Sequence, residues 1–175
     1  MHNFEAAENP IMEKLNLFGI GPKMGRIILP WLAVTIIITI IWPQCFWFAH
    51  PQPWWLLIIG IVILVAGLLL WMISGKMIVS LKNEPRLLTT GPYALCRNPL
   101  YLSMIMFVIP SIALIMNSWL VLTTSVVGYV MFRICISQEC DEMHRIFGDE
   151  YEKYCRKTPE FFPFPFLGNG SEKAN

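Results

Sequence analysis

Four apolar segments of this sequence are each close to the length that a bilayer requires, and this pattern limits the fold more than any other feature. They run from about Ile27 to Phe48, Trp54 to Ile73, Pro99 to Met116 and Trp119 to Ile136. A helix needs about 20 apolar residues to cross the hydrocarbon core, and inside lipid the backbone must satisfy its own hydrogen bonds. The sequence therefore predicts an all-α integral membrane protein. We expect a bundle of about four transmembrane helices, or five if Pro110 splits the third segment.

The composition agrees with this prediction and argues against a separate soluble module. Hydrophobic residues make up 55% of the 175 residues and charged residues only 14%, whereas a soluble domain carries about 25% charged residues. The net charge of +1 gives no reason to propose nucleic acid as a partner.

The cysteines show no Cys-x-x-Cys pair and no spacing with a histidine that is typical of a zinc site. We therefore expect free thiols and no bound metal. The residues concerned are Cys45, Cys96, Cys135, Cys140 and Cys155, with His2, His50 and His144.

Basic residues are distributed asymmetrically around the four segments. They precede the first segment, fill the loop between the second and third, and follow the fourth, whereas the connections His50–Pro53 and Asn117–Ser118 contain no Lys or Arg. The positive-inside rule then predicts that both termini and the middle loop are cytoplasmic. An even number of spans is consistent with this topology.

A polar stretch, residues 91–101, lies directly before the third apolar segment. Asn98 followed by Pro99 is typical of a helix start, because Asn caps free amides and Pro needs no hydrogen bond at the first position. Capping alone explains these two residues, but it does not explain the polar side chains around them. A helix N-terminus beside an arginine suits an anionic ligand, and the extended lead-in of residues 85–90 could offer it backbone groups. The surrounding side chains are Tyr93, Arg97 and Tyr101.

Acidic residues follow the fourth apolar segment. If its helix continues, Cys135, Glu139 and either Glu142 or Met143 share one face. Two interpretations stay open: Glu139 contributes to a polar site, or it belongs to a solvated acidic face with Asp141 and Glu142. Arg133, still at membrane depth, either extends to the interface or faces a polar cavity.

Gly148 is typical of a helix stop, with Asp149 as the next N-cap. A short helix through Tyr151 and Tyr154 should follow. The aromatic segment Phe161–Phe166 is then expected to dock at the membrane surface.

Taken together, these motifs resemble the isoprenylcysteine carboxyl methyltransferase family, which belongs with the phospholipid methyltransferases. The shared pattern is Gly-Pro-Tyr, three residues, Arg-x-Pro-x-Tyr, an apolar hairpin, a Glu, and Phe-Gly-x-Glu-Tyr-x-x-Tyr, and it covers about Lys76 to Pro165. The resemblance implies a helical bundle whose C-terminal half encloses S-adenosylmethionine on the cytoplasmic side, with S-adenosylhomocysteine as product. It also implies a lateral opening that admits a lipophilic or prenylated substrate from the membrane lipids.

On this basis we divide the chain into two parts. Residues 1–75 form an interfacial N-terminal segment and the first two transmembrane helices, and residues 76–175 form the methyltransferase core. The resemblance and the local pattern together predict catalytic roles for Glu139 and Arg133. The predicted cofactor-binding residues are Arg86, Leu87, Leu88, Tyr93, Arg97, Asn98, Pro99, Leu100, Tyr101 and Glu139.

The sequence departs from the family pattern at two positions. Asn98 replaces the usual histidine and cannot titrate near neutral pH. Cys135 stands where the eukaryotic prenylcysteine enzymes have a substrate-binding arginine, and Arg133 is the nearest arginine. The methyl-donor site is therefore expected to be retained, while recognition of a prenylcysteine carboxylate stays open.

The leading hypothesis is methyl transfer from S-adenosylmethionine to a lipophilic acceptor, most like a prenylcysteine carboxylate. A carboxylate needs no general base, whereas an amine would need Glu139 or His144 to accept a proton. The alternatives are a phospholipid-amine N-methyltransferase, an inactive lipid- or partner-binding module, and a sterol-reductase-like enzyme that uses NADPH. The short loops favour a prokaryotic cell membrane, and a eukaryotic source would imply the endoplasmic reticulum.

Overall fold

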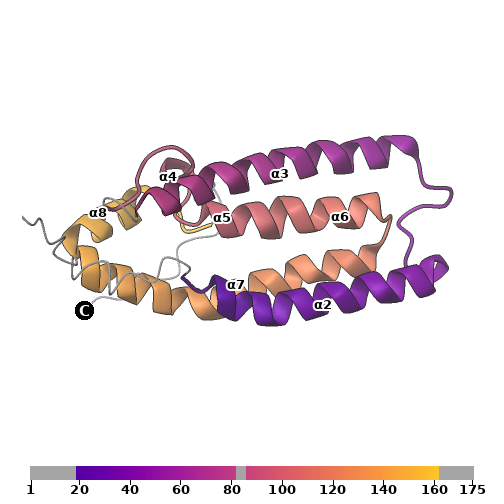
Figure 1. Ribbon diagram of the computed structural model, residues 1–175, viewed down its shortest axis with the longest axis horizontal. Coiled ribbons are helices and arrows are strands. Elements are labelled where there is room, and N and C mark those ends of the chain that lie inside the picture. Colours follow the sequence, from indigo (N-terminus) through magenta and orange to yellow (C-terminus); the bar gives the residue numbers. More distant parts are fainter. Residues whose placement is uncertain (1–18, 82–85, 162–175) are drawn as a thin grey trace, which may run out of the picture.

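The computed structural model describes residues 19–81 and 86–161, and helices dominate both ranges (Figure 1). No strand occurs in these ranges apart from one isolated bridge between Trp47 and Ser118. The predicted all-α class is confirmed. In chain order the elements are α2 (Gly21–Ile41), η1 (Pro43–Cys45), α3 (Trp54–Ser80), α4 (Pro92–Leu95), α5 (Pro99–Leu102), η2 (Ser103–Val108), α6 (Ile109–Ile115), α7 (Trp119–Phe147) and α8 (Asp149–Lys157).

Three helices, α2, α3 and α7, are long and apolar enough to cross a membrane, and Pro99–Ile115 is a shorter apolar helix. This shorter helix comprises α5, η2 and α6 without a break, so Pro110 does not divide it. Its middle part, η2, is a π-helical stretch that leads into Pro110. Proline offers no N–H to the preceding turn and crowds its carbonyl groups, and a π-turn is one local adjustment that relieves such a conflict.

Helix boundaries differ from the predicted ones because hydropathy measures lipid contact and not helix length. The first helix starts earlier, at Gly21, and ends at Ile41, since Pro43 supplies no N–H to continue it. The second and fourth helices continue past their apolar segments, to Ser80 and Phe147. The predicted division between residues 75 and 76 falls inside α3 and stays a prediction.

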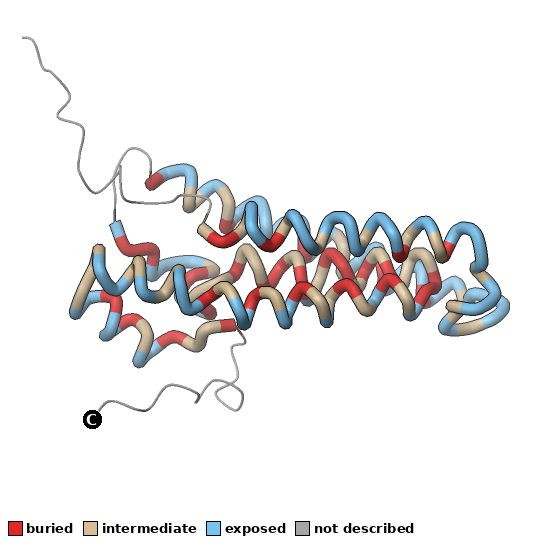
Figure 2. Tube along the Cα trace, turned by 90° about the horizontal axis from the view of Figure 1, so that it is seen from below, coloured by how far each residue is buried: buried red, intermediate tan, exposed pale blue. Residues whose placement is uncertain are grey.

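The long helices pack in a row and do not form a closed ring. Among the described residues, α3 packs on η2 and α6, α6 packs on α7, and α7 packs on α2, whereas α2 and α3 have no comparable contact. Figure 1 shows α3 and α2 on opposite sides of the molecule with α6 and α7 between them. In Figure 2, buried positions lie on the inner sides of the helices and exposed positions on the outer sides. The row therefore has two edge helices, α2 and α3.

Glycines on α3 set its distance from the neighbouring helix. A Cβ atom on Gly67 would lie 2.6 Å from Phe107 Cβ, and one on Gly60 would lie 2.9 Å from Ile115 Cγ1. Small residues permit this approach in membranes. Ala66, the neighbour of Gly67 in the sequence, is exposed.

Hydroxyl groups join α2 to α7 along the other contact of the row. Thr39 Oγ1 and Ser118 Oγ lie 2.8 Å apart, and Thr35 Oγ1 lies 3.4 Å from Thr124 Oγ1. All four residues are buried. Hydrogen bonds of this kind hold helices together where lipid offers no hydrophobic driving force.

The predicted turn at Asn117–Ser118 is confirmed. Asn117 has a φ of 51°, a value that asparagine tolerates better than most residues. Its side chain donates to Ala49 O at 2.7 Å and accepts from Ala49 N at 3.3 Å. These contacts join the loop after α2 to the hairpin between α6 and α7.

The opposite end, which we call the site end, gathers α4, α5 and α8 around the last third of α7 (Figure 1). Gly148, with a φ of 51°, ends α7 as predicted, and α8 carries the buried Tyr151 and Tyr154. Phe161 is buried against Phe132, with ring centroids 4.7 Å apart. Residues 1–18, 82–85 and 162–175 lie outside the described residues, and with them most of the predicted interfacial segment, Pro85, and the rest of the aromatic segment.

We expect Gly67→Val to lower the free energy of unfolding by about 1–3 kcal/mol, because the new side chain would overlap Phe107 Cβ and crowd Val108 in η2. Thermal unfolding in a fixed detergent measures the change. Ala66→Val is the matched control, since Ala66 is the exposed neighbour on the same helix. An equal loss of unfolding free energy in the two variants would contradict a close contact between Gly67 and η2.

Candidate functional site

A cavity of about 1160 Å³ opens at the site end between the two edge helices. Its walls come from α2, α3, the loop after α3, α4, α5, α7 and α8. On α2 the lining extends from Gly21 to Pro30, and on α3 from Trp71 to Val79, with Leu81 just after the helix. Ligand sites usually measure about 300–1,000 Å³, so this cavity has room for more than one small ligand.

Most of the sequence-predicted cofactor residues line this cavity, although they come from separate elements. Pro99 is fully buried beneath the wall, and Arg133 does not belong to the lining. Proximity brings these residues together but does not assign their roles, which stay predictions. The predicted residues in the lining are Arg86, Leu87, Leu88, Tyr93, Arg97, Asn98, Leu100, Tyr101 and Glu139.

Glu139 connects three elements at the cavity wall. Its Oε2 accepts hydrogen bonds from the Tyr101 hydroxyl at 3.2 Å and from the Ile20 backbone N–H at 3.4 Å. These contacts join α7 to α5 and to the start of α2, where a carboxylate also offsets the positive end of the helix dipole. The alternative of a solvated acidic face is therefore wrong for Glu139, although it describes the exposed Asp141.

The contribution of α2 to this wall was missed by the sequence prediction. Gly19 has a φ of 49°, and a Cβ atom there would lie 2.8 Å from Glu139 Oε2. Gly21 and Pro22 follow and also line the cavity. The signal was the Gly-Ile-Gly-Pro sequence, since a glycine at positive φ and an early proline commonly mark a helix start.

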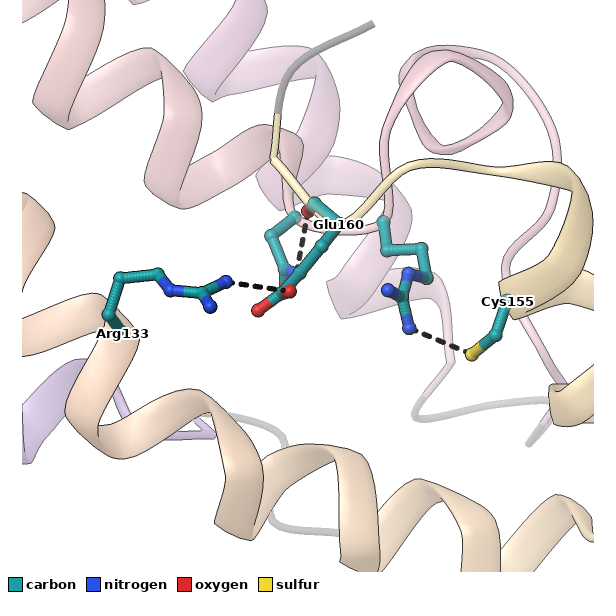
Figure 3. A network of polar contacts seen from close by, with 5 residues as sticks. Arg133, Cys155 and Glu160 are labelled. Atoms are coloured by element: carbon teal, nitrogen blue, oxygen red, sulfur yellow. Dashed lines mark hydrogen bonds and ion pairs between the residues drawn. The ribbon is translucent and has the colours of Figure 1, made fainter. Parts of the chain in front are cut away.

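Arg97 places a guanidinium group in the wall with few partners. Its Nη1 donates to Cys155 Sγ at 2.8 Å (Figure 3), and its Nε is buried without a hydrogen-bond partner in the described structure. A thiol sulfur is only a weak acceptor. Arg97 therefore keeps donor capacity that an anion entering the cavity could use.

Asn98 holds the C-terminal segment and does not cap the helix. Its Nδ2 donates to Glu160 O at 2.9 Å, and no side-chain capping bond forms at the start of α5. The expected capping by Asn98 is therefore wrong, because the bond from its amide nitrogen orients the side chain toward Glu160, in the segment after α8. Pro99 does occupy the start of the helix, as predicted.

Arg133 belongs to the same network as Asn98 and not to the cavity. Its Nη1 lies 3.0 Å from Glu160 Oε2, and 47% of its side chain is exposed (Figure 3). Arg97 N also donates to Pro159 O at 2.9 Å. The network ties residues 159–160 across the start of α5, and a catalytic role for Arg133 stays a prediction.

Two buried tyrosines fix the position of α4 beside the cavity. The Tyr154 hydroxyl donates to the Tyr93 carbonyl, and the Tyr93 hydroxyl donates to Ser74 O at 3.5 Å. Burial raises the pKa of both tyrosines above the ordinary value. Both hydroxyls thus stay protonated near neutral pH and act as donors.

The cysteines are free thiols, as predicted. Burial raises the pKa of Cys96 to about 11, so its thiol stays protonated and is a poor nucleophile. Among the residues that the structure describes, no group of three or more His, Cys, Asp and Glu side chains is arranged to hold a metal ion.

The fold and the cavity define a class of protein: an integral membrane protein with a ligand-sized chamber at one end of its helices, partly walled by lipid-facing helices. The particular family follows from sequence comparison. The chain belongs to the phospholipid methyltransferase family, whose profile matches residues 49–150. This family comprises integral membrane methyltransferases and includes the isoprenylcysteine carboxyl methyltransferases.

A relative among characterised proteins is the nickel-cobalt-cadmium resistance protein NccN of Alcaligenes xylosoxydans xylosoxydans. It is 32% identical over 85 residues, which cover 49% of this chain and 39% of NccN. The matched part of this chain thus spans about two fifths of that relative. No solved structure matches the chain.

Tyr154→Phe should lower the free energy of unfolding by about 0.5–1.5 kcal/mol, because the Tyr93 carbonyl loses its buried donor. Tyr129→Phe is the matched control, since Tyr129 is exposed and its aromatic contact with Phe161 needs no hydroxyl. Chemical or thermal unfolding of both variants measures the difference. A loss as large in Tyr129→Phe would argue against a specific role for the Tyr154 hydroxyl.

Proposed function

We propose that this protein is an S-adenosylmethionine-dependent methyltransferase that acts on a lipophilic acceptor, most like the carboxylate of a prenylcysteine. One observation carries the proposal: both halves of the family motif line the same cavity. The stretch around Tyr93–Tyr101 supplies one wall, and Glu139 through Tyr154 supply the other. The cavity also extends along two membrane helices, where an apolar acceptor would be found.

The side chains of the cavity fit the functional groups of this cofactor. Arg97, whose buried Nε has no hydrogen-bond partner among the described residues, is suited to the amino-acid carboxylate. Glu139 is suited to a cationic or hydroxyl group, since carboxylates accept charge-assisted hydrogen bonds. Leu87, Leu88 and Tyr93 add apolar and aromatic surface for a heterocyclic base.

Bound S-adenosylmethionine would supply a methyl group that is already activated by a sulfonium. The protein then has to align the acceptor with that methyl group and exclude water, which proximity and a preorganised site can achieve. Buried tyrosine donors and a wall tied together by Glu139 provide such a rigid frame. The described lining holds only two carboxylates, Glu139 and Glu142, and no histidine, which is compatible with a reaction that needs little acid-base catalysis.

A carboxylate acceptor is favoured because its methylation needs no general base. It is ionised at pH 7 and attacks without losing a proton. His144, one of two bases considered for an amine acceptor, is exposed and does not line the cavity. The lining contains no histidine in the described part of the chain.

The second candidate is a phospholipid-amine N-methyltransferase. The name of the family favours it, and Glu139 or Glu142 in the lining could accept the proton of an amine. The metal resistance named for the relative NccN is not part of the proposal, which rests on the family and the cavity.

The proposal includes the predicted topology. In the described part of the chain, the site end carries basic residues in the first turns of α2, near the end of α3, before α5 and on α8, so we place it and both termini on the cytoplasmic side. S-adenosylmethionine would then reach the cavity from the cytoplasm and the acceptor from the bilayer.

Titration calorimetry with S-adenosylhomocysteine tests the cofactor site. Glu139→Ala should weaken binding at least tenfold, about 1.4 kcal/mol, because it removes a charge-assisted hydrogen bond. Asp141→Ala is the matched control, since it removes a neighbouring exposed carboxylate.

Glu139→Gln is a control for folding, because the amide oxygen can still accept hydrogen bonds from Tyr101 and Ile20. We expect this variant to unfold at the same temperature as the wild type and to show weakened binding of S-adenosylhomocysteine, as Glu139→Ala does. A folded wild type that does not bind S-adenosylhomocysteine would refute the enzyme, and unchanged affinity in folded Glu139 variants would remove Glu139 from the site.

Methyl transfer from radiolabelled S-adenosylmethionine to a prenylcysteine analogue distinguishes the acceptors. We expect base-labile label, because a carboxyl methyl ester hydrolyses in alkali and an N-methyl group does not. Base-stable label in the phospholipid fraction would favour the second candidate. Cofactor binding without transfer to either acceptor would favour an inactive binding module.

A further inference from the structure

Two cations on the edge helices line the cavity and form no ion pair with a carboxylate in the described part of the chain. Arg26 on α2 and Lys76 on α3 both line the cavity and are exposed. In the described ranges the ion pairs are Arg133–Glu160 and Arg156–Glu152, and neither involves these cations. Two positive charges on different helices therefore border one cavity and remain able to bind an anionic ligand.

The cavity wall beside these cations changes from polar to apolar along the helices. Leu29 and Pro30 on α2, and Trp71 and Met72 on α3, line the same cavity further from the site end. Counted from Gly21 to Pro30, the lining reaches about 14 Å along α2 at 1.5 Å per residue. Because α2 and α3 do not pack on each other as the inner helices do, lipid chains can approach this wall between them.

We propose that Arg26 and Lys76 bind the anionic head group of an amphiphile whose apolar tail lies between α2 and α3. The head group would carry a carboxylate or a phosphate, since both are recognised by arginine and lysine. The inference rests on the proposed function insofar as this amphiphile is the methyl acceptor, and it assigns specificity to two residues that the sequence did not select for the site.

The charge distribution supports a separate anion site for the acceptor. The described lining holds four cationic side chains, Arg26, Lys76, Arg86 and Arg97, but only the carboxylates Glu139 and Glu142. Arg97 lies at the inner wall beside Cys155 and suits the cofactor. One cation is enough to pair with the single carboxylate of the cofactor. Arg26 and Lys76, which we call the outer cations, are therefore available for a second anion.

Basic residues near a membrane can also be explained by the positive-inside rule alone. Lys23 is an example of such a residue in this protein. It is exposed on the same helix as Arg26, donates to Gln138 Oε1 at 2.8 Å, and does not line the cavity. Lys23 is thus a matched control for a basic residue near the membrane without access to the chamber.

The test measures binding of spin-labelled stearic acid to the full chain in a neutral detergent. At pH 9 the fatty acid is ionised while arginine and lysine keep most of their charge. We expect the double variant Arg26→Gln/Lys76→Gln to bind the probe at least tenfold more weakly, and Lys23→Gln to bind it like the wild type. The labelled methyl ester should bind equally weakly to all three proteins.

Equal binding of acid and ester, or an equal loss in Lys23→Gln, would overturn the proposal. Competition by octadecyl phosphate would support a site for either anion, and competition by stearate alone would support a carboxylate site. The double variant should keep its affinity for S-adenosylhomocysteine, and a parallel loss would reassign both cations to the cofactor. A wild type that binds the probe but not S-adenosylhomocysteine would refute the enzyme and retain the anion site.

Discussion

Lipid provides no hydrogen-bond partner for an unpaired backbone amide, and this constraint determines where a functional site can form in this protein. Within the apolar segments the chain is helical, with η2 as the one π-helical stretch described. Irregular backbone occurs where the helices end, in the loops after α2 and between α3 and α5. The latter loop meets α8 and the end of α7, so the turns and free polar groups that a ligand requires are concentrated at the site end.

The row of helices turns this end site into a chamber that borders on lipid. Close packing of Gly60 and Gly67 against η2 and α6 holds α3 on one side, and paired hydroxyl groups hold α2 on α7 on the other. Neither edge helix needs the other for its position. The space between their ends can therefore stay open to an apolar molecule while Glu139 and Tyr101 fix the inner wall.

The sequence predicts the class and the number of apolar helices, and most of the site residues that it selects line the cavity, because hydropathy and local motifs depend on neighbouring residues in the chain. Hydropathy alone does not reveal that α3 and α7 extend well beyond the apolar segments. Long-range partners are harder to foresee: Asn98 bonds to Glu160 and Arg133 pairs with the same residue, contacts that depend on how α8 folds back. Ile20 is likewise far in sequence from its partner Glu139, so the role of α2 in the wall emerges only from the tertiary structure.

Glu139 links the structural and chemical properties of the site. Its carboxylate already holds the first amide of α2 through Ile20, and Arg26 lies on that helix about 9 Å further along its axis at 1.5 Å per residue. A ligand group that binds Glu139 must therefore either share the carboxylate with Ile20 or displace it. In the second case the start of α2 would move, and Arg26 with it. Cofactor binding at the inner wall and acceptor binding at the outer cations would then be coupled through α2, since one rigid helix carries contacts to both.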